Sequence, residues 1–144
     1  MHSVIVGVGN PIIGDDAAGL EVAKRLKGKI NAEIKEAVAG GLELAELIAD
    51  YDVAVIIDAF QGEGIKEMEV DDYRESVPNH DISFPSAYNM LSRYIKMPRV
   101  RIVGIGIRDF QWREGLSDEI KSVIPKVVRK IKEILEEENE LVIG

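Results

Sequence analysis

The sequence predicts an α/β fold: a single-domain, three-layer sandwich with a central, mostly parallel twisted sheet of about five strands and helices on both faces. Short apolar or alternating runs that suit strands recur between stretches whose apolar residues have helical spacing. The run 53–57 is apolar at every position, which is typical of a central parallel strand covered on both faces. With 46% hydrophobic content, residues 1–144 have the size and composition of one domain with a substantial core.

Strands and helices are expected to alternate in the first part of the chain. The apolar run 4–6 predicts a buried strand, and residues 20–26 predict an amphipathic helix. Residues 32–38 alternate apolar with charged side chains, as a strand with one wetter face does. A short amphipathic helix at 42–48 then precedes the central strand at 53–57.

An edge strand and a helix are expected next. Residues 66–70 carry charges that discourage edge-to-edge pairing, and residues 71–79 are irregular and polar. Ser83 is the expected N-cap of a helix that continues to Ile95, and Pro85 is tolerated in its first turn.

The last part of the chain predicts a buried strand at 100–107 and a long helical region that begins after the N-cap Ser117. Pro125 is expected to kink or split this region, because proline has no N–H to donate. The glutamates at 136–138 predict a solvated terminal run.

The loop between this strand and this helix carries two aromatic residues, Phe110 and Trp112. Exposed rings would offer a contact for a peptide or protein, whereas buried rings would cover the core. The sequence leaves both alternatives open.

Charge and composition exclude several classes of function. The 18 basic and 26 acidic residues give a net charge of −8, which argues against nucleic acid or an anionic membrane as a partner. The absence of cysteine excludes disulfides, thiolate metal sites and a cysteine nucleophile. Because there is no apolar leader and no apolar run approaching ~20 residues, we expect a soluble cytoplasmic protein. We also expect a monomer or a weak oligomer.

The loop at 7–19 contains glycines, a proline and two adjacent acids, Asp15 and Asp16. Both acids fall at the expected start of a helix, so one alternative is that they only cap it. The other is a ligand site, because open α/β sheets bind ligands at the carboxyl ends of their strands. A dinucleotide fingerprint would need glycine at Ile12, and no Gly-Lys-Ser/Thr follows, so a cation is the better candidate ligand.

Asp58 follows the run 53–57 directly. It is either a turn residue or, if the first and third strands are parallel neighbours, part of the same sheet edge as Asp16. Clustered carboxylates repel each other unless a cation or a proton lies between them. His80, before a helix, is either a surface residue or the third ligand of a site suited to nickel, zinc, manganese or iron.

Several motifs together resemble the hydrogenase maturation endopeptidases, and they extend over nearly the whole chain. They are Gly9-Asn10-Pro11, Asp15-Asp16-Ala17-Ala18-Gly19, Asp58-Ala59, His80 before a helix, Gly104-Ile105-Gly106 and Gly115-Leu116-Ser117. The resemblance implies a central, mostly parallel sheet between helices. It also implies an enzyme that removes a short C-terminal extension from the large-subunit precursor of a nickel-iron hydrogenase after nickel insertion.

The resemblance further implies the site residues. The family's metal-contacting residues match Asp16, Asp58 and His80, which we expect to be both metal-binding and catalytic. Nickel would be supplied by the substrate, and no organic cofactor is expected. The family often has Glu at the position of Asp16 and more glycine at 17–18, but neither change removes an oxygen ligand.

The motifs limit the possible mechanisms. Without Cys, a G-x-S-x-G elbow or H-E-x-x-H, the chain gives little support to a serine or cysteine nucleophile or to an ordinary zinc protease. We expect a nickel-dependent peptidase of aspartyl or metal-assisted type. Two alternatives stay open: a non-catalytic metal-sensing or chaperone module that binds the immature large subunit, and a small-molecule hydrolase that uses the same carboxylates.

Overall fold

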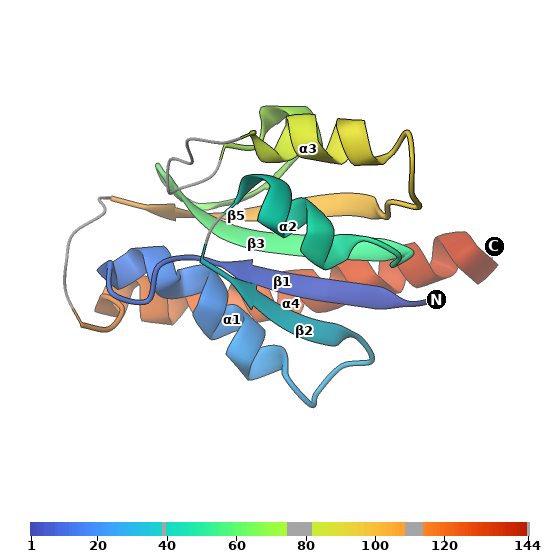
Figure 1. Cartoon of the computed structure of the whole chain (residues 1–144). Helices are drawn as coiled ribbons and strands as arrows, with labels where there is room; N and C mark the ends of the chain where they lie inside the picture. Colours follow the sequence, from blue (N-terminus) through green and yellow to red (C-terminus); the bar gives the residue numbers. More distant parts are fainter. Residues whose placement is uncertain (39, 75–81, 109–113, 144) are drawn as a thin grey trace.

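Strands and helices alternate along the chain in the computed structural model, which describes residues 1–38, 40–74, 82–108 and 114–143 (Figure 1). The elements are β1 (Ser3–Val8), the 3-10 helix η1 (Gly14–Ala17), α1 (Ala18–Leu26), β2 (Glu33–Ala37), α2 (Gly41–Ile48), β3 (Val53–Gln61), β4 (Ile65–Met68), the 3-10 helix η2 (Val70–Asp72), α3 (Phe84–Leu91), β5 (Arg99–Ile107) and α4 (Asp118–Ile143).

The five strands form one sheet in the order β2-β1-β3-β5-β4. The first four strands in this order are parallel to one another, and β4 pairs with β5 in the antiparallel direction at the edge. The central strand β3 is apolar because both of its faces are covered. The predicted α/β class, the mostly parallel sheet and the charged edge strand are confirmed.

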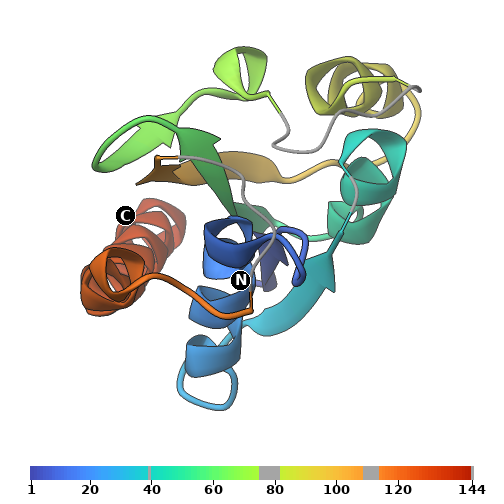
Figure 2. The same ribbon diagram turned by 90° about the vertical axis from the view of Figure 1, so that its left-hand side faces the viewer.

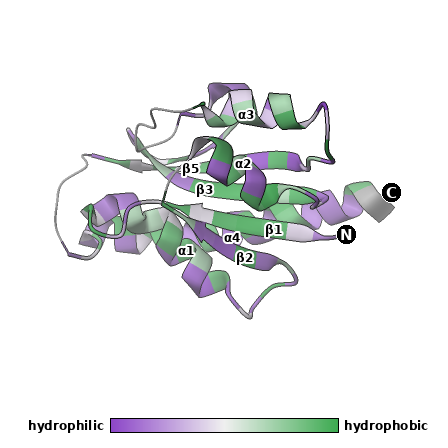
Figure 3. Cartoon of the chain, in the orientation of Figure 1, coloured by the Kyte–Doolittle hydropathy of each residue, from purple (hydrophilic) through white to green (hydrophobic). Residues whose placement is uncertain are grey.

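Helices cover both faces of the sheet, so the molecule has three layers (Figure 2). Alternate residues of β3 point to opposite faces: Val55 and Ile57 pack with α1 and α4, whereas Ala54 and Ile56 pack with α2 and α3. In Figure 3 the central strands β1 and β3 are mainly apolar, and the helices on either side of the sheet carry both apolar and polar residues. Burial of each large aliphatic side chain contributes about 1.5–3 kcal/mol.

Two element ends differ from the prediction. β3 continues to Gln61, so Asp58 lies inside the strand instead of directly after it. α3 ends at Leu91 and not near Ile95, and Tyr94 is 80% exposed. Past this end the amides of Arg93 and Tyr94 bond to carbonyls three residues back, and the Ser92 hydroxyl donates to Tyr88 O at 2.7 Å.

The last helix differs from the prediction in two ways. α4 is a single helix that includes Pro125, so the predicted split is wrong, and the alternative of a kink stays a prediction; Ile124 and Val127 on either side of the proline are buried in the core. The expected solvated run at 136–138 is wrong for Glu138, which is only 4% exposed and pairs with arginines of β5. No helix in the described part of the chain is long and apolar enough to cross a membrane.

Candidate functional site

The loop after β1 folds back on itself before the acidic pair. The Asn10 Oδ1 accepts a hydrogen bond from Ile12 N at 3.1 Å, and Ile13 N donates to Asn10 O at 3.1 Å. Gly14 follows with φ of 40°, a conformation that favours glycine. The turn leads directly into η1, which carries Asp15 and Asp16.

Two glycines let this segment pack directly on the strands. A Cβ on Gly9 would collide with the carbonyl oxygen of Asp16, and a Cβ on Gly19 would collide with that of Ile57 in β3. η1 therefore contacts β3, the strand that carries Asp58. A larger residue at either glycine would push the acidic pair away from β3.

Asp16 is fully buried, and its Oδ2 accepts a hydrogen bond from Asn10 N at 2.9 Å. Its carboxylate therefore bonds to the loop that precedes it. Neither η1 nor α1 has a side-chain cap hydrogen bond. Asp16 therefore makes a contact beyond the helix start, and the choice between a helix cap and a ligand site stays a prediction.

Asp15 joins two parts of the chain that lie far apart in sequence. Its Oδ1 accepts from Ser117 N at 2.7 Å, and its Oδ2 accepts from the Ser117 hydroxyl at 2.8 Å. Ser117 caps α4 as predicted, since its Oγ accepts from Ile120 N at 3.3 Å. Asp15 thus fixes the start of α4 beside η1, a role distinct from that of Asp16.

Asp58 lies opposite Gly104 of β5 and is 1% exposed. Its Oδ1 accepts from Ala59 N at 2.8 Å, and its Oδ2 accepts from the Tyr73 hydroxyl at 2.7 Å. A buried carboxylate needs such donors, because burial without hydrogen bonds is costly. The alternative of a simple turn residue is wrong, since Asp58 is part of a strand and bonds to a side chain from another segment.

Asp16 and Asp58 therefore lie on contacting elements at the carboxyl end of the sheet. His80, the third predicted ligand, lies outside the described residues, as do Phe110 and Trp112. Within the part of the chain that the structure describes, no group of three or more His, Cys, Asp or Glu side chains could hold a metal ion. The metal-binding and catalytic roles of Asp16, Asp58 and His80 stay a prediction.

Sequence reasoning missed Tyr73, which fell in the segment expected to be irregular and polar. The structure buries its ring, 1% exposed, in the core between the sheet, α2 and α3. The signal that could have found it is a single aromatic residue among polar neighbours at 71–79.

An open pocket of about 480 Å³ lies beside Asp15. Its walls are the turn at 62–64, the end of β5 and the first turns of α4, and Arg108 and Glu119 form a 3.2 Å ion pair beside it. A pocket of this size can hold a small ligand or a short stretch of polypeptide.

Comparison with known proteins points to one family. No protein-family model matches the chain. A Methanocaldococcus jannaschii protein, provisionally assigned as a hydrogenase maturation protease, is 27% identical to it over 89% of this chain and 92% of its own. The structure of the hydrogenase maturating endopeptidase HybD from E. coli is similar with a TM-score of 0.75 and 21% identity, over 96% of this chain and 94% of that one.

A second solved structure agrees. The [NiFe] hydrogenase maturation protease HycI from Thermococcus kodakarensis has a TM-score of 0.73 and 24% identity, over 94% of this chain and 92% of its own. The predicted resemblance to the hydrogenase maturation endopeptidases is therefore confirmed, and the chain has their fold.

Proposed function

We propose that this chain, which has the fold of the hydrogenase maturation endopeptidases, removes the C-terminal extension of a nickel-iron hydrogenase large-subunit precursor after nickel insertion. The observation that carries the proposal is the pair of buried, hydrogen-bonded carboxylates, Asp16 and Asp58, on contacting elements at one edge of this fold. The proposed reaction takes place in the cytoplasm.

Nickel enters this proposal as part of the substrate. Asp16, Asp58 and His80 bind the nickel that the precursor already holds, since carboxylate oxygen and imidazole nitrogen are suitable ligands for Ni²⁺. Three ligands leave coordination positions for the precursor's own groups. The enzyme therefore selects nickel-loaded precursor and places its scissile peptide beside the two carboxylates.

Hydrolysis then requires an attacking water and a proton acceptor. A carboxylate of the site takes a proton from the water, whose oxygen bonds to the carbonyl carbon of the scissile peptide. The C–N bond breaks as the proton passes to the departing amine, so no covalent intermediate with the enzyme forms.

The test is the mass of a purified, nickel-loaded precursor after incubation with the protein. Wild-type protein is expected to shorten the precursor, and the variants Asp16→Asn and His80→Ala are expected to leave it intact while keeping a folded circular dichroism spectrum. Wild-type-like cleavage by both variants would refute the assigned site. Binding without shortening would favour the chaperone alternative, and hydrolysis of small amides or esters alone would favour the small-molecule hydrolase.

A further inference from the structure

We propose that Tyr73 is a positioning residue that holds the Asp58 carboxylate in the orientation needed for substrate binding and hydrolysis. The proposal rests on the proposed function, in which Asp58 contacts the precursor's nickel. It starts from the hydrogen bond of 2.7 Å that the Tyr73 hydroxyl donates to Asp58 Oδ2.

The strand places the Asp58 side chain in an apolar layer. Ala54 and Ile56 precede it at two-residue spacing and belong to the core formed with α2 and α3. Tyr73 belongs to the same core. A carboxylate in these surroundings takes its orientation from its hydrogen-bond donors, because an unsatisfied one would be strongly destabilising.

The Tyr73 ring is itself held in place. It is 1% exposed and packs edge-on against Phe84, the first residue of α3, with ring centroids 5.8 Å apart at 76°. Its backbone N donates to Val70 O at 3.2 Å, which fixes the chain just after η2. The hydroxyl therefore has little freedom to move away from Asp58.

The two donors bond to different oxygens of the Asp58 carboxylate: Ala59 N to Oδ1 and the Tyr73 hydroxyl to Oδ2, so both oxygens are oriented by hydrogen bonds. A carboxylate that binds a metal is commonly oriented by such a donor, and losing the donor typically lowers metal affinity or activity about 10–100-fold. Tyr73 fits this role because its phenol fixes the direction of the carboxylate without contributing an opposite charge.

The test compares Tyr73→Phe with Tyr88→Phe. Each change removes one tyrosine hydroxyl that donates a hydrogen bond, and the Tyr88 hydroxyl donates to Pro98 O at 2.6 Å, away from Asp58. In Tyr73→Phe, kcat for nickel-loaded precursor is expected to fall about 10–100-fold and KM to rise, because Asp58 takes part in both substrate binding and hydrolysis. A crystal structure of this variant is expected to show the Asp58 carboxylate turned from its wild-type position. Tyr88→Phe is expected to keep both the wild-type kcat and the wild-type Asp58 position.

Three results would overturn the positioning role: an unmoved Asp58 in Tyr73→Phe, an unchanged kcat, or an equal fall of kcat in Tyr88→Phe. Failure of the proposed function has a different signature, because wild-type protein would then not shorten the precursor at all. In that case the position of Asp58 in the Tyr73→Phe crystal still decides whether Tyr73 orients it.

Discussion

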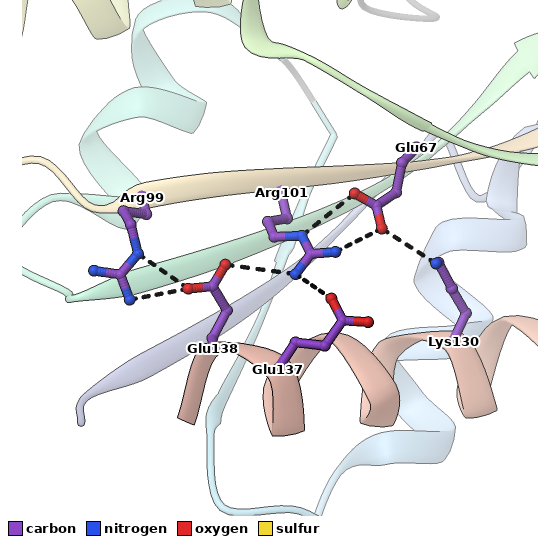
Figure 4. Close-up of polar contacts among 6 residues, drawn as sticks. All are labelled: Glu67, Arg99, Arg101, Lys130, Glu137 and Glu138. Carbon is purple, nitrogen blue, oxygen red and sulfur yellow. Dashed lines mark hydrogen bonds and ion pairs between the residues drawn. The ribbon is translucent and has the colours of Figure 1, made fainter. Parts of the chain in front are cut away.

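Among the residues that the structure describes, buried carboxylates lie in two regions, and they are held by different kinds of donor. At the carboxyl end of the sheet, Asp16 accepts from the backbone N of Asn10, and Asp58 accepts from a backbone N–H and a phenol. At the start of β5, Glu138 of α4 accepts from Arg99 Nε at 3.0 Å, and its other oxygen lies 3.6 Å from the Arg101 guanidinium (Figure 4).

The second region is a network of charged groups. Arg101 lies between β4 and α4, with one guanidinium nitrogen 2.8 Å from Glu67 and another 2.7 Å from Glu137. Lys130 of α4 reaches Glu67 at 3.2 Å. The Glu67 hydrogen bond raises the pKa of Arg101 above its ordinary value, so this guanidinium stays charged. The network ties the last helix to two strands.

The two kinds of donor indicate different roles for the two regions. Guanidinium groups neutralise the carboxylates around them, so those contacts fix how α4 lies against β4 and β5. Neutral donors fix the direction of a carboxylate and leave its charge in place. The same side-chain group therefore serves the fold in one region and, in our proposal, binds the substrate's nickel in the other.

The largest expected effect is a loss of cleavage rate when a carboxylate is removed from the first region but not from the second. Asp58→Asn should lower the cleavage rate by about 10²–10⁴-fold, because an amide is a poor base and a weak metal ligand. Glu138→Gln should keep the wild-type rate and lose about 1–3 kcal/mol of unfolding free energy, since its hydrogen bonds to charged groups weaken. Cleavage kinetics and urea unfolding of both variants measure these two effects. An equal loss of cleavage rate in both variants would contradict the separate roles of the two regions.

The network should dominate stability. Arg101→Met is expected to cost about 1–2 kcal/mol in unfolding free energy, because Glu137 loses its cation while Glu67 keeps Lys130 and Glu138 keeps Arg99. Urea unfolding gives the value, and the cleavage rate at a permissive temperature should stay that of wild type. A loss below about 0.5 kcal/mol would mean that the network contributes little.

The neighbours Asp15 and Asp16 offer a sharper version of the comparison. Asp15→Asn is expected to cost about 1–2 kcal/mol, because it weakens two hydrogen bonds to Ser117. Its cleavage rate should stay within about twofold of wild type, in contrast to Asp16→Asn. If Asp15→Asn stops cleavage as completely as Asp16→Asn does, Asp15 belongs to the site.

The smallest expected effect is a loss of stability at low pH, where Glu67 becomes protonated. Burial raises the pKa of Glu67, but hydrogen bonds from Arg101 and Lys130 outweigh burial and bring the pKa below the ordinary value of 4.5. The stabilisation from ionised Glu67 is therefore present above pH 4.5 and is lost as the pH falls through the lower folded-state pKa. The wild-type advantage over Glu67→Gln, expected to be about 1 kcal/mol at neutral pH, should vanish in acid. An advantage that grows in acid, measured by urea unfolding across pH, would contradict this.

Much of the fold could be predicted because its signals are local. Apolar runs and helical spacing marked the strands and helices, and the hydroxyls of Ser83 and Ser117 cap α3 and α4 as expected. The burial of Glu138 could not be predicted, since its partner Arg99 lies 39 residues earlier in the chain. Helical spacing does not show that a charged residue faces two arginines on a strand.

The candidate site also has a part that could be predicted from the sequence and a part that could not. Asp16 and Asp58 could be predicted to share one edge because parallel strands end at the same side of a sheet. The role of Tyr73 could not be predicted. Its hydroxyl reaches Asp58 only because η2 and α3 pack so that Tyr73 lies between Phe84 and the sheet, and the sequence does not show this packing.

The most direct test of the account is to incubate the same precursor with and without nickel and measure its mass. The account predicts that the C-terminal extension is removed only from the nickel-loaded precursor, because the carboxylates at the sheet edge act on a substrate held through its metal. Equal shortening of both forms would contradict it.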